Sequence, residues 1–103
     1  MSKTLQDKTL GTLTSVNPYN GEVLKTYAEM TPAAVEAAIE AADTAFRVWR
    51  EQSFEDRATI LRRVAALFRE RREALARIMT LEMGKKIEDS RPEIDLCARI
   101  FEY

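Results

Sequence analysis

Two short runs of β-prone residues open the patterned part of the sequence. They occupy positions 12–16 and 22–27 and are separated by Asn17-Pro18-Tyr19-Asn20-Gly21. The Asn20-Gly21 pair accepts the positive φ angles of a tight turn, and Pro18 keeps Asn17 extended. This pattern predicts a β-hairpin. Because a two-stranded hairpin is marginal alone in water, and no third strand is indicated, we expect the hairpin to lie on a larger body.

Helical spacing of apolar residues replaces the strand pattern after Thr31. Its hydroxyl can cap a helix, and Pro32 suits the first helical position because its φ is fixed and it lacks an N–H. The apolar residues that follow at steps of three and four fall on one arc: Val35, Ala38, Ile39, Ala42, Ala45, Phe46 and Trp49. The alanine-rich flank of this helix predicts close packing against a neighbouring backbone.

A second helical region is predicted to begin at Ser53-Phe54-Glu55-Asp56, which resembles a capping box with Asp in place of Glu. Its apolar stripe comprises Ile60, Leu61, Val64, Leu67, Phe68, Leu75, Ile78 and Met79. The stripe lapses over residues 70–73, which either one bent helix or two abutting helices would satisfy. It stops at Gly84, a residue suited to a left-handed C-cap.

The last apolar pattern crosses a proline. The residues Ile87, Ile94, Cys97, Ala98 and Phe101 keep one helical phase, although an interior proline costs about 3 kcal/mol in a helix. We therefore expect a helix start or a kink near Pro92. The pattern runs to Tyr103 without a Gly, Asn or Pro to stop it, which indicates a segment of a larger protein.

Together these patterns predict a mostly α chain with one N-terminal β-hairpin. Residues 1–11 are polar and aperiodic, and we expect them to form a disordered arm, whereas residues 12–103 carry the hairpin and the helices. The apolar faces of the helices exceed what the chain can cover. They are therefore expected to pack against parts of a protein that this sequence does not contain.

Composition removes several classes of function. The 103 residues carry 16 Lys plus Arg against 17 Asp plus Glu, so the net charge of −1 provides no field to hold nucleic acid or an anionic membrane. With no His and one Cys, the sequence lacks a zinc ligand set, a disulfide and a His-based catalytic group. It also lacks a signal peptide and any run near the roughly 20 apolar residues of a membrane span, so we expect a cytosolic protein.

Two candidate chemical features have simpler structural interpretations. Cys97 shares an apolar face with Ile94 and Phe101, which favours a buried, inert thiol over a nucleophile. The arginine-rich stretch over residues 57–77 has glutamates interleaved, and this pattern favours a solvated mixed-charge face over a nucleic-acid patch.

Two arginines and one leucine depart from the pattern around them. Helical phase puts Arg57 and Arg71 on the apolar side, and buried guanidinium groups need partners. We expect them to pair with carboxylates or carbonyls across a helix contact or on an absent domain. Leu96 lies with Pro92 on the face opposite Ile94, which makes it a candidate for function, although an isolated exposed leucine needs no explanation.

Several segments, taken together, resemble the N-terminal part of the aldehyde dehydrogenase superfamily. They follow the family's order and spacing over about residues 13–103 and look nearest to bacterial semialdehyde dehydrogenases, succinate-semialdehyde dehydrogenase among them. The segments are Val16-Asn17-Pro18-Tyr19-Asn20-Gly21-Glu22-Val23, Ala41-Ala42-Asp43-Thr44-Ala45-Phe46-Arg47-Val48-Trp49-Arg50, Arg57-Ala58-Thr59-Ile60-Leu61-Arg62-Arg63-Val64-Ala65, Leu81-Glu82-Met83-Gly84-Lys85 and Ile100-Phe101-Glu102-Tyr103.

The resemblance implies a fragment equivalent to the first part of the α/β NAD(P)-binding domain of an enzyme that oxidises an aldehyde to a carboxylic acid. In the family, a cysteine thiolate attacks the carbonyl, hydride passes to NAD or NADP, and water activated by a glutamate releases the acid. The motifs around those groups do not occur here, and Cys97 does not match the nucleophile. The chain alone is therefore expected to have no catalytic or metal-binding residue and to bind no cofactor. Its expected partner is the remainder of the dehydrogenase, a homo-oligomer when complete.

The resemblance also implies two site residues. In the family the last helix of this segment passes near the mouth of the substrate tunnel, and the register from Phe101-Glu102-Tyr103 turns Pro92 and Leu96 toward that mouth. Pro92 departs from the commoner non-proline residue at its position.

A different class of function is a stand-alone helical interaction module, which would present the Trp49 face or the Leu61 stripe to a partner. Such a module would melt cooperatively, whereas an isolated segment of an enzyme would aggregate or stay molten.

Overall fold

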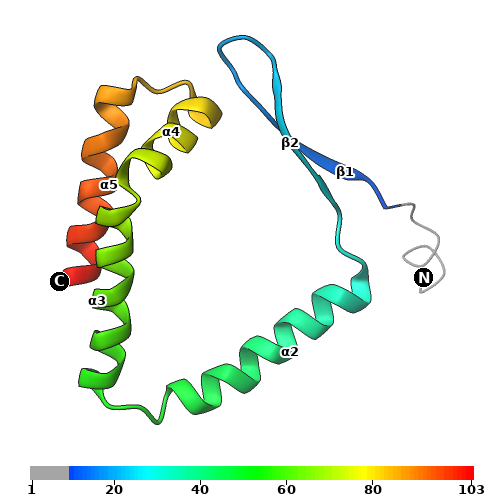
Figure 1. Ribbon diagram of the computed structural model, residues 1–103. Helices are drawn as coiled ribbons and strands as arrows, with labels where there is room; N and C mark the ends of the chain where they lie inside the picture. Colours follow the sequence, from blue (N-terminus) through cyan, green and yellow to red (C-terminus); the bar gives the residue numbers. More distant parts are fainter. Residues whose placement is uncertain (1–9) are drawn as a thin grey trace.

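The computed structural model describes residues 10–103, which form two strands and four helices. In chain order these are β1 (Thr12–Val16), β2 (Val23–Ala28), α2 (Pro32–Trp49), α3 (Phe54–Glu70), α4 (Arg72–Met83) and α5 (Ile87–Glu102). Figure 1 shows that the hairpin forms one side of the molecule, α2 forms a second, and α3, α4 and α5 lie together on a third. The predicted mostly α fold with one hairpin is confirmed.

The hairpin forms where the sequence predicts it. β1 and β2 pair antiparallel, with Leu13 opposite Tyr27. Gly21 adopts a φ of 75°, and its N–H donates to the Asn17 carbonyl at 2.8 Å. The Glu29 N–H also donates to the Gly11 carbonyl at 3.0 Å, which extends the pairing beyond β1. Of the arm expected over residues 1–11, residues 1–9 lie outside the described part of the chain.

The three predicted helix caps are present. Thr31 Oγ1 accepts a hydrogen bond from the Ala34 N–H at 3.0 Å, and Ser53 Oγ accepts one from the Asp56 N–H at 3.0 Å. Gly84 ends α4 with a φ of 72°, a left-handed conformation that glycine adopts without a Cβ clash. Local sequence therefore determined where these helices begin and end.

The chain departs from helical geometry at Arg71, whose φ of −100° and ψ of 19° separate α3 from α4. Of the two arrangements that the lapse over residues 70–73 allowed, the chain adopts two abutting helices.

Of the helix start or kink expected near Pro92, the helix start is wrong. Helix α5 begins five residues earlier, at Ile87, and continues through the proline. Pro92 removes one backbone hydrogen bond, to the Glu88 carbonyl, but the inner face of α5 buries Ser90, Ile94 and Ala98 and keeps the helix intact. A kink near Pro92 stays a prediction.

The buried residues of the described chain lie mainly in α3, α4 and α5. Helix α5 runs antiparallel to α3 and packs against both α3 and α4 (Figure 1). The buried apolar residues are Ala65, Ala76, Ile94 and Ala98. Three of the four are alanines, so the helix backbones approach closely.

The rest of the described chain is open. Helix α2 has no buried residue, and its apolar residues Val35, Ile39 and Phe46 are exposed. The radius of gyration is 18.7 Å, against about 13 Å for a compact chain of this length. The apolar face of α2 thus lacks a covering partner among residues 10–103, whereas the hairpin contacts α4 but leaves Leu13 and Val23 exposed.

Candidate functional site

The two predicted site residues lie on the outer face of α5. Pro92 and Leu96 are one helical turn apart, and both are exposed, Leu96 to 47%. Ile94 and Ala98 point the other way and are buried. The departure of Leu96 from the buried stripe is therefore confirmed, while its role at a tunnel mouth stays a prediction.

A third apolar residue continues this outer face and was missed by the sequence analysis. Ile100 lies one turn after Leu96 and is 63% exposed. The steps of four from Pro92 to Leu96 to Ile100 keep all three on one side of a helix. That spacing was the signal that could have identified Ile100. We call these three residues, which share this face with the exposed Arg99, the outer stripe.

Charged side chains fix α5 against its neighbours and so fix the direction of the outer stripe. Arg72 binds Asp95 through two hydrogen bonds, Nε to Oδ1 at 2.7 Å and an Nη atom to Oδ2 at 2.9 Å. Arg69 binds Glu102 in the same bidentate way, at 2.9 and 3.0 Å. Two planar contacts on one helix constrain its rotation more than point charges would.

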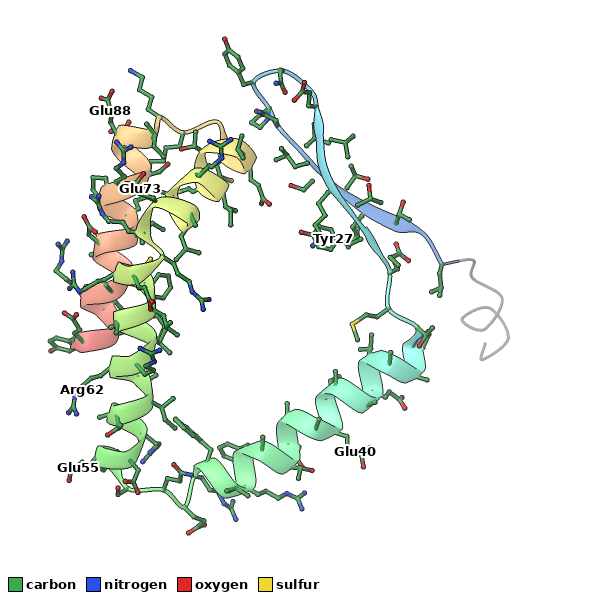
Figure 2. The ribbon with its side chains drawn as sticks, viewed as in Figure 1. Tyr27, Glu40, Glu55, Arg62, Glu73 and Glu88 are labelled. Carbon is green, nitrogen blue, oxygen red and sulfur yellow. The ribbon has the colours of Figure 1, made fainter. Side chains whose placement is uncertain are left out.

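A third bridge links the first turn of α4 to α5. Arg91 Nε donates to Glu73 Oε1 at 2.8 Å, and Figure 2 shows Glu73 beside α5. Lys85, in the turn that leads into α5, contacts Glu93 of that helix.

The bridges change the acidity of their carboxyl groups. Hydrogen bonding from Arg72 lowers the pKa of Asp95, and hydrogen bonding from Arg69 lowers the pKa of Glu102. Arg91 lowers the pKa of Glu73 by the same means. In each case the guanidinium stabilises the ionised carboxylate, so all three are charged at neutral pH.

The remaining candidate residues do not assemble into a reactive group in the described chain. Cys97 is half-buried rather than buried. Arg57 is half-buried and Arg71 exposed, and neither forms an ion pair within residues 10–103. Their pairing across a helix contact is therefore not seen there, and pairing with another part of the protein stays a prediction.

Within residues 10–103, His, Cys, Asp and Glu form no group of three or more that could hold a metal ion. None of the described helices is long and apolar enough to cross a membrane.

Comparison with known proteins identifies the family. The model of the aldehyde dehydrogenase family matches residues 5–103. The chain belongs to the aldehyde dehydrogenase family. The resemblance seen in the sequence is thereby confirmed, including its likeness to succinate-semialdehyde dehydrogenases.

Two curated relatives in this family are at least 40% identical to this chain over the matched residues. The succinate-semialdehyde dehydrogenase [NADP(+)] of Deinococcus radiodurans is 44% identical over 89 residues, which is 86% of this chain and 19% of that protein. The succinate-semialdehyde dehydrogenase [NADP(+)] of Escherichia coli is 40% identical over 87 residues, 84% of this chain and 18% of that protein. The chain thus spans about a fifth of the length of the aldehyde dehydrogenases that it matches.

Solved aldehyde dehydrogenases have the same fold over this region. The betaine aldehyde dehydrogenase of Staphylococcus aureus, in complex with NAD+, superimposes with a TM-score of 0.83 at 40% sequence identity. The match covers 90% of this chain and 19% of that one. The open arrangement in Figure 1 is therefore a recurring arrangement of this part of aldehyde dehydrogenases.

Proposed function

We propose that this chain is the N-terminal section of an NAD(P)-dependent semialdehyde dehydrogenase, an incomplete piece of its dinucleotide-binding domain that is not catalytic alone. The observation that carries the proposal is the 44% identity to a succinate-semialdehyde dehydrogenase over 86% of the chain. The complete enzyme would oxidise an aldehyde to a carboxylic acid. NADP is the cofactor named for two relatives and NAD+ the one bound in the S. aureus structure, so either dinucleotide is consistent.

The proposed contribution of this section is structural support for the rest of the subunit. The uncovered residues of α2, among them Ile39 and Phe46, provide apolar surface against which other parts of the subunit can pack. The bridges to Asp95 and Glu102 hold α5 in one orientation. A catalytic nucleophile, a general base and the cofactor site would come from the remainder of the enzyme.

A chimeric enzyme tests this proposal. Residues 12–103 replace the matching segment of the D. radiodurans succinate-semialdehyde dehydrogenase, and NADP+-dependent oxidation of succinate semialdehyde is followed by NADPH absorbance. We expect activity within about tenfold of the parent, a loss of roughly 1.4 kcal/mol or less in transition-state stabilisation. The 103-residue chain alone should show none. A folded chimera without activity toward any semialdehyde would contradict the proposal.

The outer stripe is the proposed contact with substrate. Pro92 and Leu96 would face the mouth of the substrate tunnel, and the exposure of Leu96 on α5 supports this position. In the chimera, Leu96→Trp should raise KM several-fold for bulky aldehydes and leave KM for a small aldehyde nearly unchanged. Glu40→Trp, at an exposed polar residue of α2, is the matched control. Equal substrate profiles for the two variants would remove Leu96 from the site.

The assembly of the complete enzyme is also a proposal. Exposed apolar residues on both the hairpin and α2, including Tyr27 and Val48, leave enough surface for contacts between subunits as well as within one. We expect the chimera to be a homo-oligomer by light scattering.

A further inference from the structure

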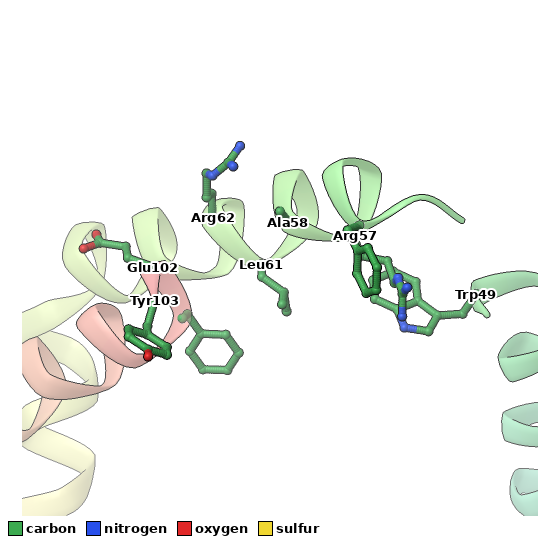
Figure 3. A pocket seen from close by; sticks show the side chains of 9 residues that line it. Trp49, Arg57, Ala58, Leu61, Arg62, Glu102 and Tyr103 are labelled. Carbon is green, nitrogen blue, oxygen red and sulfur yellow. The ribbon is translucent and has the colours of Figure 1, made fainter. Parts of the chain in front are cut away.

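Three joints connect the sides of the molecule. The hairpin, α2 and the group of α3, α4 and α5 form the sides of an open frame (Figure 1). Residues 29–31 join the hairpin to α2, and residues 50–53 join α2 to α3. At the second joint, Figure 3 shows Trp49 and Arg57 on the same side of the pocket that they line. The third joint lies between the hairpin and α4 and brings together residues far apart in the chain.

The third joint is a narrow contact. Pro18, in the hairpin turn, packs against Gly84, which ends α4, and a Cβ at position 84 would lie 3.1 Å from Pro18 Cγ. Away from this contact, β2 and α4 line a cavity of about 350 Å³, whose walls include Leu24, Tyr27 and Leu81. The hairpin therefore meets α4 at its turn and along β1, and it leaves space beside β2.

The hairpin turn is held by its own hydrogen bonds. The Asn17 N–H donates to the Glu22 carbonyl at 2.8 Å, and the Asn17 carbonyl accepts from the Gly21 N–H at 2.8 Å. The Asn17 side chain is buried, and its Oδ1 accepts from the Tyr19 N–H at 2.9 Å. These bonds surround Pro18, whose ring fixes its own φ. The Pro18 ring therefore cannot move aside unless the hairpin moves with it.

The end of α4 is also fixed. Gly84 has a φ of 72°, and its N–H donates to the Thr80 carbonyl at 3.0 Å. Thr80 Oγ1 lies 2.9 Å from the Oγ of Ser90, a fully buried residue of α5. The surface that Pro18 meets thus belongs to the packed group of α3, α4 and α5.

We propose that Pro18 and Gly84 form a clasp, which closes the frame and sets where the hairpin lies relative to α3, α4 and α5. Without this contact, the hairpin would turn about residues 29–31, which lie outside any strand or helix. Helix α2 would not oppose the movement, because it makes no extensive contact with another element in the described part of the chain. The inference goes beyond the proposed function, since the clasp lies entirely within this chain.

Two glycines with nearly the same backbone conformation provide a matched pair of substitutions. Gly21 has a φ of 75°, close to that of Gly84, but a Cβ at position 21 would meet no atom within 4 Å. Gly21→Ala and Gly84→Ala therefore add the same left-handed strain, and only Gly84→Ala also brings an atom against Pro18. Pro18→Ala removes Cγ and keeps Cβ, which lies at the ordinary contact distance of 3.9 Å.

Spin-label distances measure the position of the hairpin. Labels are attached to the 103-residue chain at Thr26→Cys in β2 and Glu88→Cys in α5, two exposed positions, with Cys97→Ser to remove the native thiol. We expect one narrow distance distribution in this labelled parent and with Gly21→Ala, and a broad distribution with Gly84→Ala. A broad distribution in the parent, or no broadening with Gly84→Ala, would overturn the proposal.

Pro18→Ala separates the clasp from the helix cap. Added to Gly84→Ala, it relieves the collision and should narrow the distance distribution again. Added to Gly21→Ala, it relieves nothing and should bring no gain. If the distribution stays broad in the first pair, Gly84→Ala acts through the end of α4 alone, and the proposal is overturned.

Thermal unfolding of the chimera gives a second measurement. Gly84→Ala should lower the midpoint by several degrees more than Gly21→Ala, and Pro18→Ala should recover part of this extra loss, because neighbouring substitutions are not additive. Equal losses for the two glycine variants would contradict the clasp. Neither measurement uses enzymatic activity, so an inactive chimera would count against the proposed function and not against this inference.

Discussion

Helices α2 and α5 have similar lengths and similar amphipathic patterns, but they differ in how much of their surface is buried. Helix α5, of 16 residues, buries Ser90, Ile94 and Ala98, whereas α2, of 18 residues, buries none. Both helices have an apolar face, but only the face of α5 packs against other helices within the described residues. An amphipathic pattern thus specifies a helix and its inner face, but the surrounding protein decides whether that face is covered.

The polar faces of the two helices differ in the same way. The ion pair on α2 joins Asp43 and Arg47 at 2.8 Å, four residues apart on one helix. The bridges on α5 reach other helices, from Arg69 to Glu102 and from Arg72 to Asp95. Among residues 10–103, the ion pair on α2 therefore supports only the helix itself, whereas those on α5 select its position on α3 and α4.

The largest expected difference between the two helices is the cost of removing an apolar side chain. Ile94→Ala on α5 should lower the free energy of unfolding of the packed helices α3, α4 and α5 by about 3 kcal/mol, because it removes a buried side chain and leaves a cavity. Ile39→Ala on α2, where the side chain is 65% exposed, should change it by less than about 0.5 kcal/mol. Urea unfolding followed by circular dichroism measures both. Equal losses would mean that α2 is packed in solution.

A smaller effect is expected at the proline inside α5. Pro92→Ala restores a backbone hydrogen bond and removes a steric conflict with the Glu88 carbonyl, and it should stabilise the chain by about 2 kcal/mol after the added freedom of the unfolded state is subtracted. Pro32→Ala at the first position of α2 is the control and should be nearly neutral, since that N–H has no intrahelical acceptor. No gain at Pro92 would mean that the helix has already adjusted around it.

The smallest expected effect is the loss of stability at low pH. Glu73, Asp95 and Glu102 have pKa values below their ordinary values of 4.5, 3.8 and 4.5. Their stabilisation is fully present above the pKa of the unfolded chain and is lost as the pH falls through the lower folded-state pKa. The urea midpoint should therefore fall when the pH is lowered from 6 to 3. Asp95→Asn should reduce that fall, while Asp43→Asn should leave it unchanged.

Local chemistry accounts for the elements that could be predicted from the sequence. The caps at Thr31, Ser53 and Gly84 involve backbone groups within three or four residues, so they can be predicted without any tertiary information. The start of α5 could not be predicted from the sequence. The free-energy cost of Pro92 in a helix is a local effect, whereas the stabilisation from burying Ile94 and Ala98 comes from contacts with α3 and α4.

The candidate site could be predicted from the sequence only where it depends on helical phase. Helical phase identified Leu96 as an outward residue, and the four-residue spacing would have added Ile100. The partner of Arg57 could not be predicted, because no acceptor for its Nε lies within residues 10–103. A tunnel mouth needs walls from other elements, so the role of the outer stripe depends on the rest of the enzyme.

Residue-resolved hydrogen exchange on the intact 103-residue chain tests most directly whether α2 depends on protein outside this segment. Amides in the second half of α5, such as those of Ala98 and Arg99, should exchange at least about tenfold more slowly than those of Ile39 and Glu40 in α2, because of these two helices only α5 is held by burial and by bridges to other helices within residues 10–103. Equal protection of the two helices, lost in one cooperative melt, would contradict the account and would favour a self-contained interaction module.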